Sequence, residues 1–228
     1  MRPAWQEPDF RERHPRARPG KKPGRAHQKA RCRVCGLHPE LCACAELPRV
    51  MLPIELMVIQ HAIEEHRPTN TGRLVLHMFP RSRLIPYGRA GEPLEDSPFV
   101  EPGRRYLLLF PRAGARSLTK EDLVPAGGAP VSLIIPDGNW RQASRITRRN
   151  RVLAEMPCLS LPPGPPGAWT IRNSRHHDRL CTAEAAARVA EILGFRDEAA
   201  RMCEMIALIN GRMLRMRPKH APLANPAD

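Results

Sequence analysis

Two largely uninterrupted apolar runs constrain the fold of this chain more than any other feature. They span residues 106–110 (YLLLF) and 131–135 (VSLII), and a proline directly follows each run. A strand inside a parallel sheet is covered by helices on both faces, so it shows continuous instead of alternating apolar residues. We therefore expect both runs to be buried strands of a mostly parallel sheet.

Strand and helix patterns alternate along the rest of the chain. Residues 54–59 predict a further strand, and residues 84–85 predict a short one. The segments that predict helices are 70–79, 140–151, 182–193 and 197–216. This alternation is typical of an α/β domain with helices on both faces of its sheet.

Composition predicts where the domain begins and ends. Residues 1–30 are rich in proline, arginine and glycine and lack apolar periodicity, which predicts a disordered basic arm. We expect a small cysteine-containing element over 31–50, the α/β domain over 51–217 and a tail over 218–228. Neither a membrane span of roughly 18 apolar residues nor a signal peptide is expected, which favours a cytoplasmic protein.

Four cysteines lie within thirteen residues and share a spacing that is typical of metal sites. The pattern is Cys32-x2-Cys35-x6-Cys42-x-Cys44. Short loops of this kind can bring four thiolates into a tetrahedron around Zn²⁺, and four protein ligands leave no position open for a substrate. We expect a structural zinc site. The alternatives are a disulfide framework, a thiol redox pair, or His38 in place of one thiolate.

The charge of the chain favours a polyanionic partner. There are 37 lysines and arginines against 23 acidic residues, a net charge of +14. Residues 1–31 alone hold ten basic and three acidic side chains, a net charge of +7. Such an arm gains affinity for nucleic acid by releasing condensed counterions, although a solvated tail would have the same composition.

Polar and aromatic residues lie between three of the expected strands and the segments that follow them. These segments are 69–73 (TNTGR), 110–111 (FP) and 137–140 (DGNW), and an arginine-rich helix follows the last. Ligands of parallel α/β sheets bind just beyond the carboxyl ends of the strands. A fourth segment, 181–185 (CTAEA), begins a helix in which either Cys181 or Thr182 could be the N-cap. An Asp-Gly turn with a packing tryptophan is the structural alternative for residues 137–140.

The DGNW segment resembles the Asp-x-Thr-Trp signature of the DTW-domain family, the tRNA-uridine aminocarboxypropyltransferases. Four more features agree in chain order: the cysteine spacing, Asn70-Thr71-Gly72-Arg73, Leu109-Phe110-Pro111, and Cys181-Thr182-Ala183-Glu184-Ala185. The resemblance covers about residues 31–215. The chain departs from the family at Asn139, where threonine is usual.

The resemblance implies a SPOUT-like α/β fold whose C-terminal part threads a trefoil knot. It also implies an enzyme that transfers the 3-amino-3-carboxypropyl group of S-adenosylmethionine to N3 of a uridine in tRNA. The products would be acp3U and 5′-methylthioadenosine. No obligate protein partner and no membrane partner is evident.

The expected site residues fall into three sets. S-adenosylmethionine would contact Asn70, Thr71, Phe110, Pro111, Asp137, Gly138, Trp140 and Thr182. The candidate catalytic residues are Asp137 and then Glu184, although Asp137 could instead only shape its loop. The tRNA would contact Arg141, Arg145, Arg148, Arg149, Arg172 and Arg175.

Two other functions fit parts of the sequence. A non-catalytic, zinc-containing RNA-binding protein would explain the charge and the cysteines, but it leaves the four polar segments unexplained. An RNA methyltransferase that uses S-adenosylmethionine would keep the fold and the co-substrate and differ only in the group transferred.

Overall fold

The computed structural model describes residues 30–89, 92–124, 126–172 and 180–216. The expected arm (apart from its last residue) and tail lie outside the described residues. Within the described residues, six strands form one sheet in which every neighbouring pair is parallel, in the order β2-β1-β5-β3-β6-β4. The prediction of an α/β domain with a parallel sheet is therefore confirmed.

The strands are β1 (Glu55–His61), β2 (Ser82–Tyr87), β3 (Arg105–Leu109), β4 (Arg116–Ser117), β5 (Val131–Asp137) and β6 (Cys158–Ser160). The helices are α2 (Gly72–Met78), α3 (Lys120–Leu123), α4 (Trp140–Arg149), α5 (Arg151–Glu155), α6 (Thr182–Ile192) and α7 (Arg196–Arg215). Short 3-10 turns lie at Pro39–Leu41, Cys44–Glu46, Ala62–Glu64, Ser97–Phe99 and Ala126–Gly128. No helix in these described ranges has the length and apolarity that crossing a membrane requires.

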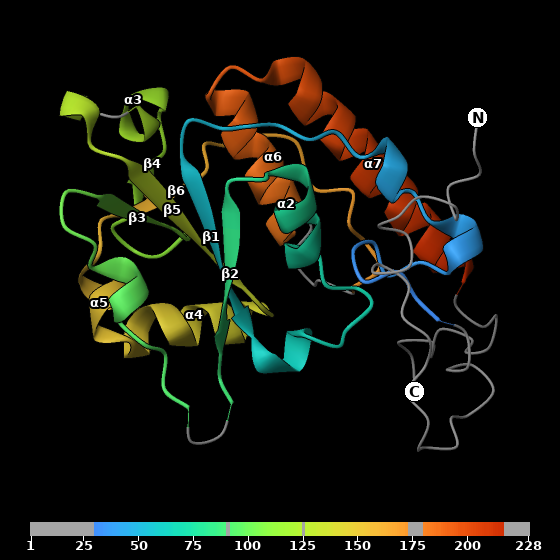
Figure 1. Cartoon of the computed structure of the whole chain (residues 1–228), viewed down its shortest axis with the longest axis horizontal. Helices are drawn as coiled ribbons and strands as arrows, with labels where there is room; N and C mark the ends of the chain where they lie inside the picture. The colour runs from blue at the N-terminus through green and yellow to red at the C-terminus, as the bar shows by residue number, and fades with distance from the viewer. Residues whose placement is uncertain (1–29, 90–91, 125, 173–179, 217–228) are drawn as a thin grey trace, which may run out of the picture.

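Helices cover both faces of the sheet, as Figure 1 shows. Alternate residues of β5 point to opposite sides, because side chains alternate along a strand. Leu133 packs in the larger core with α2, α6, α7 and the cysteine element, while Ile134 packs in a smaller core with α4 and α5. All seven residues of β5 are buried, which accounts for its continuous apolar sequence.

The helix expected over 140–151 is in fact two helices, so that prediction was wrong in its extent. Asn150 ends α4 in an extended conformation, and its side chain accepts a hydrogen bond from the backbone N–H of Leu153 at 2.9 Å. Asn150 thereby caps the start of α5. Asparagine is a preferred N-cap because its side chain competes for backbone N–H groups, which ends the preceding helix.

Three short elements have no counterpart in the sequence prediction. They are β4, β6 and α3, and none is longer than four residues. Apolar periodicity needs a longer window to be recognised, and both residues of β4 are exposed.

Candidate functional site

The candidate site lies where β1 and β5 end. The two strands are parallel neighbours, and Gln60 of β1 pairs in register with Asp137 of β5. Helices α2 and α6 begin at the same edge and pack against each other. The fold therefore brings together segments that are more than 100 residues apart in the sequence.

Asp137 is the centre of this site and is almost completely buried, with 5% of its surface exposed. Its Oδ2 accepts hydrogen bonds from Asn70 Nδ2 at 2.6 Å and from Gln60 Nε2 at 3.1 Å. Its Oδ1 accepts one from the hydroxyl of Thr182 at 2.6 Å. All three donors are neutral, and they come from β1, the start of α2 and the start of α6. Three of the residues expected at the site, Asn70, Asp137 and Thr182, are thus in direct contact.

The start of α2 approaches Asp137 closely because residue 72 is a glycine. A Cβ atom built on Gly72 would lie 2.6 Å from Asp137 Oδ2. Thr71, just before it, is buried and is the N-cap residue of α2. A side chain at position 72 would therefore push the Asn70 turn away from the carboxylate.

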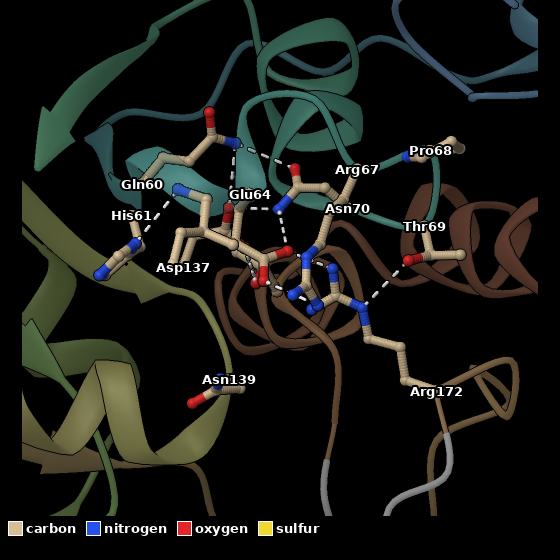
Figure 2. Close-up of polar contacts among 12 residues, drawn as sticks. Gln60, His61, Glu64, Arg67, Pro68, Thr69, Asn70, Asp137, Asn139 and Arg172 are labelled. Carbon is tan, nitrogen blue, oxygen red and sulfur yellow. Dashed lines mark hydrogen bonds and ion pairs between the residues drawn. The ribbon is translucent and has the colours of Figure 1, made fainter. Parts of the chain in front are cut away.

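A partly buried ion pair lies next to Asp137. Glu64 is fully buried and pairs with Arg172, whose Nε also donates to the Thr69 hydroxyl at 3.3 Å. Asn70 Nδ2 lies 3.5 Å from Glu64 Oε2, so that its amide stands between the two carboxylates, as Figure 2 shows. Burial of a glutamate requires a partner of this kind, because an unpaired buried charge is costly.

Arg172 therefore uses its guanidinium group inside the protein. The sequence prediction placed it among the tRNA contacts. In the structure its partners are Glu64 and Thr69, and about a third of the side chain is exposed, so its contact with tRNA stays a prediction. Arg175 lies outside the described residues.

Glu184 holds an irregular segment of the chain. Its Oε1 accepts hydrogen bonds from the backbone N–H groups of Ala168 at 2.6 Å and Trp169 at 3.0 Å. Its Oε2 accepts one from Cys181 N at 2.7 Å, which makes Cys181 the N-cap of α6 and resolves the two alternatives. Asn210 of α7 continues the pattern, because its Oδ1 accepts from the next two backbone N–H groups, those of Thr170 and Ile171.

The aromatic residues lie at the same sheet edge but on the opposite face. Phe110 follows β3 and is buried, and its ring centroid lies 5.6 Å from that of Trp140 at the start of α4. Pro111 is exposed next to it. Phe110 and Trp140 thus belong to the smaller core, whereas Asn70 and Thr182 approach Asp137 from the side of α2 and α6.

His61, the last residue of β1, was not anticipated from the sequence. Its Nδ1 accepts a hydrogen bond from Ile63 N at 3.2 Å, and its ring packs edge-on against Tyr87. Burial lowers the pKa of His61; the carboxylate of Glu64 opposes this shift and the charge of Arg145 adds to it. A Cβ atom built on Gly138 would lie 3.1 Å from Gln142 Cβ and 3.6 Å from His61 Cβ, so the first turn of α4 lies close to this corner of the site.

Four arginines of α4 are exposed: Arg141, Arg145, Arg148 and Arg149. The first three follow helical spacing and share one face of the helix. Because α4 starts directly after Asp137 and Gly138, this cationic face begins at the site edge.

The four clustered thiols have the geometry of a metal site. The ligand atoms of Cys32, Cys35, Cys42 and Cys44 all lie within 4.8 Å of one another. Cys32 Sγ lies 3.5 Å from Cys44 Sγ, and Cys35 Sγ lies 3.8 Å from Cys42 Sγ. Tetrahedral zinc with Zn–S bonds of about 2.3 Å would separate its sulfurs by about 3.8 Å. The donor set therefore fits a metal ion of this kind.

A comparison with known protein families shows to which family the chain belongs. The family model for the DTW domain matches residues 29–212. The chain belongs to the DTW domain family. Two similar curated proteins are tRNA-uridine aminocarboxypropyltransferase 2 of Macaca fascicularis, 28% identical over 173 residues, and its Mus musculus counterpart, 29% identical over 173 residues. No solved structure matches significantly.

These matches cover 74% of this chain and 58% of each relative. The chain thus spans a little more than half of the length of the curated relatives it matches.

Each residue of the DTW signature has a distinct task in this chain. Asp137 joins three elements, Asn139 caps α4, and Trp140 packs on Phe110. Asn139 Oδ1 accepts from Gln142 N at 2.9 Å, and Gln142 Oε1 accepts from Asn139 N at 2.8 Å. Threonine and asparagine are both good N-caps, which explains how the substitution at this position is accommodated.

Sequence reasoning also missed Gln60 and Glu64 as parts of the DTW site. A glutamine that ends an apolar strand was a usable signal, because a buried amide needs partners. Glu64 gave no signal, since it lies in a short turn whose burial depends on Arg172, 108 residues further along the chain.

Proposed function

We propose that this DTW domain transfers the 3-amino-3-carboxypropyl group of S-adenosylmethionine to N3 of a uridine in tRNA. Membership in the family and the names of the two relatives support the proposal. The observation that carries it is the convergence of Asn70, Asp137 and Thr182 at one sheet edge, where parallel α/β sheets bind ligands.

The reaction breaks one bond of the sulfonium and forms one new bond. Uridine N3 attacks the Cγ carbon, the Cγ–S bond breaks with its electron pair passing to sulfur, and 5′-methylthioadenosine leaves. The N3 proton passes to a base or to solvent. Selection of Cγ over the methyl carbon requires positioning, because near-attack geometry at about 3–3.5 Å favours one carbon.

Asp137 is our first candidate for the residue that orients the reactants. Both of its carboxylate oxygens already accept hydrogen bonds, which favours an orienting role over that of a freely accessible base. Glu184 is the less suitable candidate, since backbone N–H groups occupy both of its oxygens. We retain Thr71, Phe110, Pro111, Gly138 and Trp140 as cofactor contacts around this centre.

We propose that tRNA lies along the exposed arginines of α4, with the arm supplying further charge. The four-cysteine element would hold structural zinc, because its four ligands leave no open coordination position. The SPOUT-like knotted topology is a proposal that follows from the resemblance, and the cytoplasmic location is a proposal that follows from the composition of the sequence.

The test of this function is to identify the by-product and the modified nucleoside. Purified protein, S-adenosylmethionine and unmodified tRNA are incubated together, and mass spectrometry follows both products. We expect 5′-methylthioadenosine and acp3U in equal amounts. S-adenosylhomocysteine would instead show a methyltransferase, and RNA binding without any turnover would favour the non-catalytic alternative.

A further inference from the structure

We propose that Arg73 is a positioning residue that couples the four-cysteine element to the site, by holding the Arg67–Asn70 turn and by balancing the charge of the thiolates. This coupling would hold the site in place without taking part in the reaction. Its test therefore needs neither S-adenosylmethionine nor tRNA.

Arg73 holds the turn that presents Asn70. Its Nη2 donates to the backbone carbonyl of Arg67 at 2.9 Å and to that of Pro68 at 3.1 Å. The carbonyl of Arg67 also accepts the hydrogen bond that closes the turn, from Asn70 N at 3.0 Å. The guanidinium group and the turn thus share one acceptor, and the side chain of Asn70 reaches Asp137 from that turn.

The cysteine element contacts the same turn through the backbone at Gly36. Gly36, next to Cys35, has a φ of +71°, and a Cβ atom there would overlap the carbonyl oxygen of Pro68. Only glycine adopts this conformation easily and leaves room for that carbonyl. The backbone of the cysteine loop therefore abuts the carbonyl that Arg73 binds.

Electrostatics link Arg73 to the thiols as well as to the site. Burial lowers the pKa of Arg73, while the charges of Cys32, Cys35, Asp137 and Cys44 act in the opposite direction. Its Nε is buried and has no hydrogen-bond partner in the described part of the chain. A half-buried cation whose only hydrogen bonds among the described residues go to two backbone carbonyls is best accounted for by these nearby negative groups.

A four-thiolate zinc centre supplies such a negative group. Four thiolates around one Zn²⁺ ion leave a net charge of −2, and groups around the ligands tune the affinity of the ion. Among the other contacts of the element, Arg212 Nη1 donates to Leu41 O at 2.8 Å, and His77 Nε2 lies 3.1 Å from Cys44 O. Neither contact reaches the Asn70 turn.

Three variants of the zinc-loaded full chain test the coupling. Arg73→Met removes the positive charge and the hydrogen bonds to the carbonyls of Arg67 and Pro68. Arg73→Lys keeps the charge but lacks the planar guanidinium group that makes these hydrogen bonds. Arg33→Met is the control. Arg33 lies between Cys32 and Cys35 but is exposed. The readouts are the rate of zinc release to a chelator and the hydrogen–deuterium exchange of residues 67–72, with residues 131–137 as the internal reference.

For Arg73→Met we expect zinc release to accelerate by about tenfold, together with faster exchange at 67–72 but not at 131–137. Arg73→Lys should restore zinc retention without restoring exchange protection, and Arg33→Met should match the wild type in both. Unchanged exchange at 67–72 in Arg73→Met, or an equal increase at 131–137, would overturn the inference. Failure to bind S-adenosylmethionine would bear on the proposed function alone.

Discussion

At the scale of single residues, the site depends on one buried carboxylate with three neutral donors. Sequence patterns identified Asn70, Asp137 and Thr182, because each stands at the start of a helix or the end of a strand. They missed Gln60, although its place at the end of an apolar run was a usable signal, and they gave no signal for Glu64. The register of β1 against β5 sets the contact of Gln60 with Asp137, whereas the partner of Glu64 depends on where Arg172 lies in space.

Replacing Asp137 by asparagine should damage both the site and the fold. The new amide would present its NH₂ group either to the donors of Gln60 and Asn70, which then lose their acceptor, or to the Thr182 hydroxyl, which must then accept, and in both cases a neutral oxygen replaces a charged one in a buried place. We expect a loss of about 1–3 kcal/mol in the free energy of unfolding, measured by denaturant titration, and loss of acp3U formation.

The control for this variant is Asp197→Asn, at an exposed aspartate in the first turn of α7. Zinc content should stay at the wild-type level in both variants. Full stability and full turnover in Asp137→Asn would remove Asp137 from the account.

Glu184→Ala should loosen residues 168–169 specifically. Three backbone N–H groups lose their acceptor, and unsatisfied buried donors cost about 1–3 kcal/mol each. Hydrogen exchange at Ala168 and Trp169 should rise more than at Thr170 and Ile171, which Asn210 holds. Equal protection in the variant and the wild type would show that Glu184 has no anchoring role.

At the scale of elements, the length of each helix or strand decided whether the sequence could predict it. The long strands and α6 and α7 were predicted within a few residues, because each has a continuous or periodic apolar pattern. The break between α4 and α5 was missed, since it depends on the side chain of Asn150 rather than on periodicity. The two-residue strand β4 and three-residue strand β6 are too short to carry a pattern.

The proposed tRNA-binding role of the arginine face of α4 can be tested separately. Replacing Arg141, Arg145 and Arg148 together by alanine should weaken the binding of tRNAs of different sequence to a similar extent. The slope of log affinity against log salt should fall by about one for each phosphate that the variant no longer neutralises. Fluorescence titration at several salt concentrations measures the slope. The affinity for S-adenosylmethionine should not change.

Arg196→Ala, Arg201→Ala and Arg215→Ala together form the control, because these arginines lie on the distant helix α7. A wild-type salt slope in the α4 variant, or an equal fall in both variants, would exclude this face as the RNA-binding surface.

At the scale of the whole molecule, the parallel sheet makes the candidate site possible. Neighbouring parallel strands end at one edge, so that β1, β3 and β5 deliver Gln60, Phe110 and Asp137 to it. Sequence reasoning could predict this convergence from the order of strands and helices. It could not predict that the aromatic pair and the polar cluster lie on opposite faces, because that depends on the register of β3 against β5.

The central claim is that the cluster around Asp137 receives the sulfonium co-substrate. Calorimetric titration of S-adenosylmethionine into the wild type and into Thr182→Val tests it most directly, with Arg148→Met as the control. Valine keeps the shape of threonine but removes the hydroxyl that donates to Asp137 at 2.6 Å. The account predicts binding to the wild type and the control, and an affinity about tenfold lower for Thr182→Val. No binding by the wild type, or equal affinity for all three proteins, would contradict it.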